Sequence, residues 1–245
     1  MVSEGEVNMI RAIFFDIDDT LYSSTDLSSK SRRTAIEHMI SKGLEMDPEE
    51  AYQALLRVVR RYGSNYGYHL DRFFTDELKR PPDYRMISAA VIAYHHTKFV
   101  NMRPYPHAVE TIIELRTKDL RLGVITDGLP VKQWEKLVRL GLDDFFGTVI
   151  ISGDESVGLN KPDPKVFEIA LEKIGVTAGE AMMVGDKIHT DIDGANRVGM
   201  TSVWLRIPRD PPDLPREMKI HPDFTITDIR QVLDVVQDLE GSSGD

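Results

Sequence analysis

The sequence has no cysteine among its 245 residues. This absence excludes disulfide bridges, thiolate nucleophiles and zinc sites built on cysteine. Long apolar runs are missing as well, because none approaches the roughly 20 residues that a helix needs to span a bilayer. The N-terminal segment 1–9 is acidic and lacks the apolar stretch of a secretory signal. We therefore expect a soluble protein of the cytoplasm that does not bind membranes.

Positive charge is scarce, since 30 Lys and Arg residues stand against 40 Asp and Glu residues, for a net charge of −10. This balance counts against a groove for nucleic acid and against an anionic membrane surface as partner. The glycine-rich patterns GxxxxGK[ST] and GxGxxG are also absent. Neither a nucleoside triphosphate site of the P-loop type nor a dinucleotide site is expected for this reason.

The stretch 11–22, RAIFFDIDDTLY, joins an apolar run to a cluster of carboxylates. Residues 12–15 predict a strand that is buried on both faces, as in a parallel sheet. Asp16, Asp18 and Asp19 follow it directly. Two carboxylates about 4 Å apart repel each other by roughly 4 kcal/mol at an effective dielectric constant near 20. Ligands bind at the carboxyl ends of such strands, so a hard divalent cation, Mg²⁺, is the favoured explanation. The alternative is an Asp-rich turn that caps the next segment.

The rest of the chain divides into a helical block and an alternating block. Residues 23–102 predict helices only, and the segment after residue 105 alternates strands with helices. The predicted helices of the first block are 31–42, 48–63, 70–79 and 84–98. The later strands are 120–126, 148–152, 181–184, 201–205 and 224–227, and the later helices are 106–117, 131–140, 164–174, 191–198 and 228–239. Alternation of this kind is typical of βαβ units. We predict an α/β fold with a doubly wound parallel sheet, formed by residues 1–22 and 103–245, and an all-helical insert, 23–102.

Polar residues also end the later strands. Thr126, Asp127 and Gly128 follow one strand, and Asp186 follows another, with Asp191 five residues further on. The carboxyl ends of parallel strands lie at one edge of a sheet, so these groups should meet Asp16 and Asp18 there. Lys161, from the loop NKPDP, can reach the same edge. The combination predicts a site for a metal ion and a phosphate group.

Four motifs resemble those of a known superfamily. DIDDT at 16–20, ITDG at 125–128, Lys161 in NKPDP and GDKIHTD at 185–191 are similar to the four signature motifs of the haloacid dehalogenase-like hydrolases. The resemblance covers nearly the whole predicted core, and the helical insert takes the place of the helical cap of that superfamily. It implies a Rossmann-like core, a mobile cap and magnesium-dependent phosphoryl transfer.

The resemblance also implies a role for each motif residue. Asp16 is the nucleophile that forms an aspartyl-phosphate, and Asp18 is the acid that protonates the leaving alcohol and then the base that activates water. Lys161 neutralises charge on the nucleophile and on the phosphoryl group. The phosphate-binding set is Thr126, Asp127, Gly128 and Lys161. The magnesium set is Asp16, Asp18 through its backbone carbonyl, Asp186 and Asp191, the last directly or through water.

The implied activity is hydrolysis of phosphate monoesters of small metabolites, such as the sugar or triose phosphates, glyceraldehyde 3-phosphate among them. Asp18 favours phosphoester chemistry, because the dehalogenases of the superfamily lack this second aspartate. A phosphomutase or a nucleotidase of the same superfamily remains an alternative. An alternative of another class is a regulatory protein that binds a phosphorylated ligand without turnover. Tyr22 and Ser23 are expected to touch the substrate, and a homodimer is a further expectation.

Overall fold

The computed structural model describes residues 9–207 and 219–241. The N-terminal segment 1–9, in which no secretory signal was expected, lies outside the described residues apart from Met9. Ser24–Met102 form one compact unit, and the described residues before and after it form the other. None of the helices in the described ranges combines the length and apolar character that a bilayer crossing requires.

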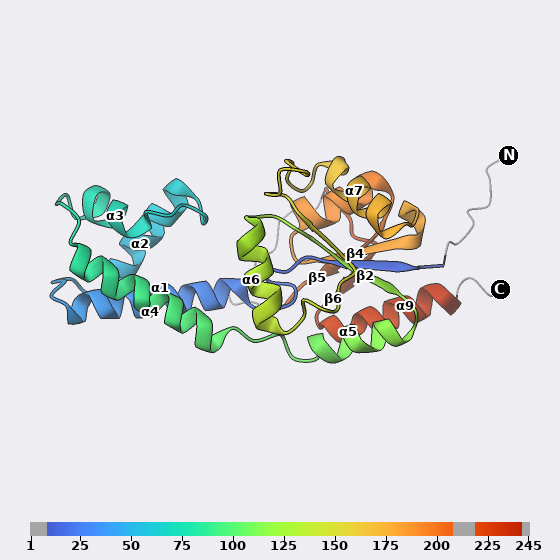
Figure 1. Ribbon diagram of the computed structural model, residues 1–245, viewed down its shortest axis with the longest axis horizontal. Coiled ribbons are helices and arrows are strands. Elements are labelled where there is room, and N and C mark those ends of the chain that lie inside the picture. The colour runs from blue at the N-terminus through green and yellow to red at the C-terminus, as the bar shows by residue number, and fades with distance from the viewer. Residues whose placement is uncertain (1–8, 208–218, 242–245) are drawn as a thin grey trace. The chain divides into compact units, whose positions relative to one another are not determined.

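Six parallel strands form one sheet within the described part of the second unit (Figure 1). The strands are β1 (Ala12–Phe15), β2 (Arg121–Thr126), β3 (Thr148–Ile151), β4 (Ala181–Gly185), β5 (Thr201–Leu205) and β6 (Phe224–Ile226). Their order across the sheet is β3-β2-β1-β4-β5-β6. The predicted doubly wound α/β fold is confirmed.

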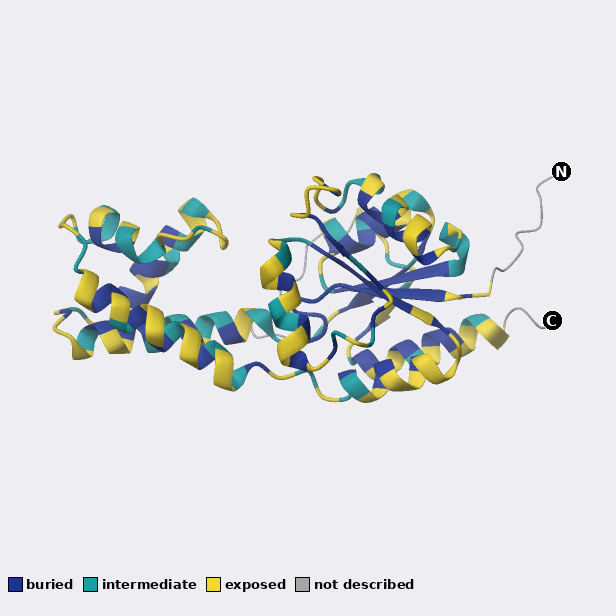
Figure 2. Cartoon of the chain, viewed as in Figure 1, coloured by how far each residue is buried: buried dark blue, intermediate teal, exposed yellow. Residues whose placement is uncertain are grey.

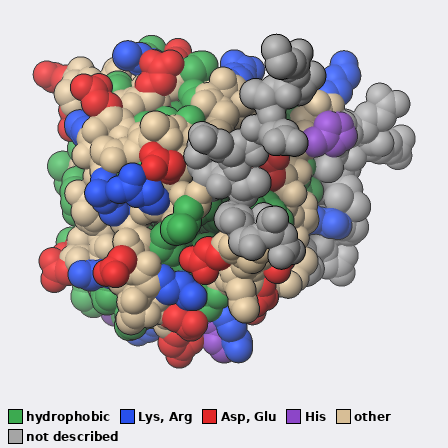
Figure 3. Space-filling model, turned by 90° about the vertical axis from the view of Figure 1, so that its right-hand side faces the viewer, with side chains coloured by type: hydrophobic (Ala, Val, Ile, Leu, Met, Phe, Trp, Pro, Cys, Tyr) green, Lys and Arg blue, Asp and Glu red, His purple; other side chains and the backbone are tan. Residues whose placement is uncertain are grey.

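Helices cover both faces of this sheet, with α7 on one side and α5 and α9 on the other (Figure 1). The helices of this unit are α5 (Ala108–Thr117), α6 (Pro130–Leu140), α7 (Pro164–Ile174), α8 (Asp193–Val198) and α9 (Val232–Gly241). Burial of both faces explains why the strands are apolar runs without alternation. Figure 2 shows the strands as almost entirely buried and the helices as buried along one side only. Acidic and basic side chains are interspersed over the face drawn in Figure 3.

β1 occupies the position at which the strand order reverses. It pairs with β2 on one side and β4 on the other, and Phe15 is aligned with both Val124 and Val184. The chain therefore leaves the sheet at Asp16 between the ends of β2 and β4. In doubly wound sheets such a switch point opens a crevice between neighbouring loops, and ligands bind there.

The other unit, Ser24–Met102, is entirely helical within its regular elements. It contains α1 (Ser24–Ser41), α2 (Pro48–Tyr62), α3 (His69–Arg72), the π-helix η1 (Phe73–Glu77) and α4 (Tyr84–Asn101). α2 begins as predicted, since the Asp47 carboxylate accepts the Glu49 and Glu50 N–H groups at 2.9 and 3.0 Å. The helix predicted over 70–79 is present over 69–77, but it is not a single α-helix. A short α-helix passes into a π-helix where Phe73 and Phe74 are both fully buried.

The helix predicted from residue 31 begins earlier, at Ser24. Its first turns, STDLSSK, carry one large apolar residue, Leu27, so hydrophobic periodicity does not reveal them. Leu27 and Ser31 are nevertheless buried in the structure.

Candidate active site

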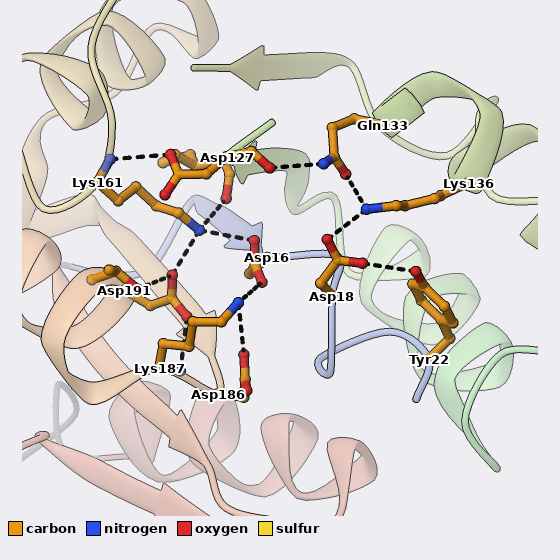
Figure 4. Close-up of polar contacts among 12 residues, drawn as sticks. Asp16, Asp18, Tyr22, Asp127, Gln133, Lys136, Lys161, Asp186, Lys187 and Asp191 are labelled. Atoms are coloured by element: carbon orange, nitrogen blue, oxygen red, sulfur yellow. Dashed lines mark hydrogen bonds and ion pairs between the residues drawn. The ribbon is translucent and has the colours of Figure 1, made fainter. Parts of the chain in front are cut away.

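A buried ion pair stands at the end of β1. Asp16 is only 2% exposed, and its Oδ1 accepts a hydrogen bond from Lys161 Nζ at 2.8 Å (Figure 4). The same ammonium donates to Asp191 Oδ1 at 2.6 Å and to the Ile125 carbonyl at 2.9 Å. All three N–H bonds of the lysine are thereby used. The prediction that Lys161 reaches the strand edge is confirmed by these contacts.

Charge compensation keeps this pair ionised. Burial alone would raise the pKa of Asp16, but Lys161 and Lys187 outweigh burial and hold that pKa below its usual value. For Lys161, burial favours the neutral amine, yet Asp16 and Asp191 raise its pKa further above the ordinary range. Asp16 is consequently a carboxylate at neutral pH, which is the form that a nucleophile requires.

Three carboxylates meet beside this pair. Asp16, Asp186 and Asp191 each offer one oxygen, and these oxygens lie within 4.8 Å of one another. Asp16 Oδ2 and Asp186 Oδ1 are buried and have no hydrogen-bond partner among the described residues. Buried carboxylate oxygens are normally paired. Two such oxygens without hydrogen bonds, in one acidic cluster, fit a hard cation with oxygen ligands such as Mg²⁺.

Lys187 partly compensates the negative charge of this cluster. Its ammonium lies 3.8 Å from Asp16 Oδ2 and 3.7 Å from Asp186 Oδ1, beyond hydrogen-bond distance. Burial, opposed by Lys187 but reinforced by Asp16 and Asp191, raises the pKa of Asp186 to about 7. The Asp186 carboxyl therefore holds a proton part of the time at neutral pH, and a divalent cation would favour its ionised form.

Asp191 is held on both sides. It lies in the π-helix η3 (Ile188–Ile192), which precedes α8, whereas the prediction made Asp191 the first residue of an ordinary helix over 191–198. Its Oδ1 accepts from Lys161, and its Oδ2 accepts the Lys187 N–H at 3.0 Å. Burial and the nearby Asp16 raise the pKa of Asp191, whereas Lys161 opposes that rise. With both oxygens engaged, Asp191 is better placed to orient the other groups than to bind a metal ion alone.

Gly185 is the residue that lets Asp191 approach the sheet. A Cβ atom at this position would collide with Asp191 Oδ2. We expect Gly185→Ala to displace Asp191, to reduce the free energy of unfolding by about 1–3 kcal/mol and to remove most activity. Urea unfolding and turnover measure the two effects. Gly147→Ala is the matched control, because its Cβ would meet only the Leu122 carbonyl at 3.9 Å; equal behaviour of the two variants would contradict the prediction.

The predicted phosphate-binding residues lie at the end of β2 and just beyond it. Thr126 is buried as the last residue of the strand. The Asp127 carboxylate accepts the backbone N–H of Lys161 at 3.1 Å, which ties the lysine loop to β2. The Gly128 N–H donates to Ser152 Oγ at 3.0 Å, so it already has a partner within the protein. Phosphate binding by these residues stays a prediction.

Asp18 makes a separate set of contacts. Its Oδ1 accepts from the Tyr22 hydroxyl at 2.7 Å, and its Oδ2 accepts from Lys136 Nζ at 2.5 Å (Figure 4). The expectation that Tyr22 touches substrate stays a prediction, and the contact observed for its hydroxyl is with Asp18.

The sequence did not predict Lys136 as a site residue, because it lies in the middle of α6 and not at a strand end. It also missed Lys187, although this residue stands inside the GDKIHTD motif.

Comparison with known proteins gives consistent matches over most of the chain. A family model described as haloacid dehalogenase-like hydrolase matches residues 13–205. A glyceraldehyde 3-phosphate phosphatase of Methanopyrus kandleri is 46% identical over 233 residues, which cover 94% of this chain and 99% of that protein. A protein of the same name from Pyrococcus abyssi is 50% identical over 198 residues, or 81% of this chain and 82% of its own length.

A solved structure gives the same result for the three-dimensional fold. The crystal structure of a phosphatase from Thermococcus onnurineus, described as a HAD phosphatase, superimposes with a TM-score of 0.64 at 30% sequence identity. The match covers 93% of this chain and 98% of that one. The likeness therefore includes both the sheet and the inserted helices.

Proposed function

Because the chain belongs to the haloacid dehalogenase-like hydrolase family, we propose that it is a magnesium-dependent phosphatase of small phosphate monoesters. The buried Asp16–Lys161 pair at the switch point of the sheet carries this proposal. It supplies an ionised carboxylate at the place where ligands bind in this fold. Relatives named glyceraldehyde 3-phosphate phosphatase make glyceraldehyde 3-phosphate the first candidate substrate.

The reaction uses this chain's own residues in two steps. Asp16 attacks phosphorus, the bond from phosphorus to the ester oxygen breaks, and Asp18 gives a proton to the departing alcohol. Asp18, now a carboxylate, removes a proton from water, which attacks the same phosphorus and frees Asp16 and inorganic phosphate. Lys161 reduces the repulsion between the nucleophile and the phosphoryl oxygens throughout. Thr126 and the N–H of Asp127 bind phosphoryl oxygens.

Magnesium has a defined set of candidate ligands in the acidic cluster. Asp16 Oδ2 and Asp186 Oδ1, which are buried and accept no hydrogen bond in the described structure, would hold it together with the backbone carbonyl of Asp18. Asp191 would contribute through water, since Lys161 and the Lys187 N–H occupy its oxygens. When bound, the ion neutralises part of the charge on the phosphoryl group.

Phosphate release from a panel of esters tests the proposal. The panel contains p-nitrophenyl phosphate, glyceraldehyde 3-phosphate, sugar phosphates and nucleoside monophosphates, each assayed with Mg²⁺, with EDTA and with Mg²⁺ restored in excess. We expect turnover only with Mg²⁺, and the highest kcat/KM for glyceraldehyde 3-phosphate.

Other results would favour the alternatives. Activity that EDTA leaves intact would contradict the metal requirement. A preference for nucleoside monophosphates would indicate a nucleotidase, and isomerised sugar phosphates without phosphate release would indicate a mutase. Binding of these ligands without turnover would support a regulatory protein. The cytoplasmic location, the homodimer and the role of the helical insert as a cap over the substrate stay predictions.

A further inference from the structure

A second polar network connects Asp18 to the end of β2 through helix α6. Lys136 Nζ donates to Asp18 Oδ2 at 2.5 Å and to Gln133 Oε1 at 3.0 Å, and Gln133 Nε2 donates to the Asp127 carbonyl at 2.7 Å (Figure 4). Lys136 and Gln133 are three residues apart on α6 and share one side of that helix. None of these contacts involves Asp16, Lys161 or the acidic cluster.

The amide of Gln133 is fixed in one orientation. Gln133 is 3% exposed, and a Cβ on Gly128 would collide with its Nε2, so the two residues are in close contact. Only the NH₂ end of the amide can donate to the Asp127 carbonyl. The amide oxygen is consequently presented to Lys136. Because β2 and α6 are both rigid elements, Lys136 has a defined position relative to the strand that carries Thr126.

Both oxygens of Asp18 are occupied, but by partners of different kinds. Tyr22 lies four residues along the same loop, and burial, reinforced by Asp18, raises the pKa of Tyr22, so it remains a phenol that donates. Lys136 comes from a separate element, 118 residues away in sequence. It therefore relates the Asp18 carboxyl to a separate element of the core, whereas Tyr22 belongs to the same loop as Asp18.

This ion pair differs from an ordinary surface pair. The side chains of Lys136 and Asp18 are 17% and 24% exposed, and Gln133 restricts the lysine further. Exposed lysine pairs contribute little because two flexible side chains must be ordered in water. Here the hydrogen bond to Gln133 already orders the lysine ammonium, so the pair can hold a carboxyl group in one orientation at a smaller entropic cost.

We propose that Lys136, oriented by Gln133, is a positioning residue that directs the Asp18 carboxyl toward the leaving group. This inference rests on the proposed phosphatase function. An acid that delivers a proton must stand within hydrogen-bond reach of the ester oxygen. With Lys136 on Oδ2, the other oxygen, Oδ1, is the one that exchanges its Tyr22 contact for the substrate. When Asp18 is in its protonated form, the proton lies on Oδ1 and passes from there to the ester oxygen.

The dependence on leaving group separates positioning of the acid from a general loss of activity. An alkyl phosphate needs a proton on its departing oxygen, whereas p-nitrophenolate leaves without one. We expect Lys136→Met to lower kcat/KM about 100-fold for glyceraldehyde 3-phosphate and less than about 10-fold for p-nitrophenyl phosphate, within the range for one general acid. The values are measured with the full chain at saturating Mg²⁺. Lys136→Arg, which keeps charge and donors, should recover part of the loss for the alkyl ester.

Lys132→Met is the matched control, because Lys132 lies one turn earlier on α6, is 59% exposed and pairs with Glu135. It should leave both esters unaffected. Equal losses on the two esters with Lys136→Met, or no loss on either, would overturn the inference while the proposed function stands. Absence of phosphate release by the wild-type protein on both esters would overturn the proposed function and this inference with it. Urea unfolding of each variant confirms that folded protein is compared.

Discussion

Asp16→Asn is expected to abolish phosphate release and to leave the chain folded. An amide cannot attack phosphorus to form the acyl phosphate, so we expect turnover of p-nitrophenyl phosphate to fall by at least about 10⁴-fold. Stability should change little. Lys161 keeps Asp191 and the Ile125 carbonyl as partners. The substitution also removes one negative charge from a cluster of three carboxylates and two lysines, which reduces the repulsion among the carboxylates.

Two further measurements make the Asp16 prediction specific. Asp19→Asn is the matched control in the same loop, and its positive φ of 63° is one that asparagine tolerates; we expect it to keep activity within about 10-fold of wild type. Beryllium fluoride should form a phosphate-like adduct with the wild-type carboxylate and not with the Asp16→Asn variant. If mass spectrometry shows that the introduced amide is intact and the variant still keeps more than a hundredth of the activity, Asp16 is not the nucleophile.

Lys161→Met is expected to damage both activity and stability. It leaves the buried Asp16 and Asp191 carboxylates without their shared cation, and breaking a buried pair in this way costs about 3–5 kcal/mol of unfolding free energy. Turnover should fall by about 10³-fold or more, because the repulsion between nucleophile and phosphoryl oxygens is no longer reduced. Urea unfolding and p-nitrophenyl phosphate turnover measure the two losses.

The loss of stability should depend on pH. In the wild type the lowered pKa of Asp16 contributes stability that is present above the unfolded-state pKa and is lost as pH falls through the folded-state value. In the variant the two buried carboxylates keep only Lys187 as a nearby cation among the described residues. Burial then raises their pKa values, so stability falls as pH rises above the unfolded-state pKa. The difference between wild type and variant should therefore be larger at pH 7 than at pH 4.5.

Lys165→Met is the matched control for this prediction. Lys165 is four residues further on, is 60% exposed and pairs only with Glu168, at 3.3 Å, among the ion pairs of the described residues. Its loss should cost less than about 1 kcal/mol and show little dependence on pH. If Lys161→Met were as stable as Lys165→Met at pH 7, the buried lysine would not compensate Asp16 and Asp191 in the way that its contacts indicate.

Much of the fold followed from local patterns in the chain. The apolar runs before Asp16 and Asp186 are strands, as predicted, and the first is buried on both faces, as was also predicted. Asp47 and Asp163 cap the helices that follow them, which begin at the predicted residues 48 and 164. These features depend on residues close together in sequence, so they can be read without tertiary contacts. The family resemblance is likewise confirmed. The helix predicted over 70–79 is present over 69–77, but its change to a π-helix was not predicted, because a single π-helical turn has no periodicity of its own to detect.

The amino-acid sequence by itself determined which strands form a parallel sheet and that Asp16, Asp186 and Lys161 would be carried to one edge of it. Only the tertiary structure decided which buried carboxylate oxygens lack a hydrogen-bond partner among the described residues, that Lys187 lies near two of them as an ion-pair partner, and that Lys136 of α6 reaches Asp18. The physical reason is the range of the interactions. Apolar runs and helix caps are patterns among neighbours in the chain. These ion pairs depend instead on how separate elements pack, and the distances that decide their strength exist only after packing.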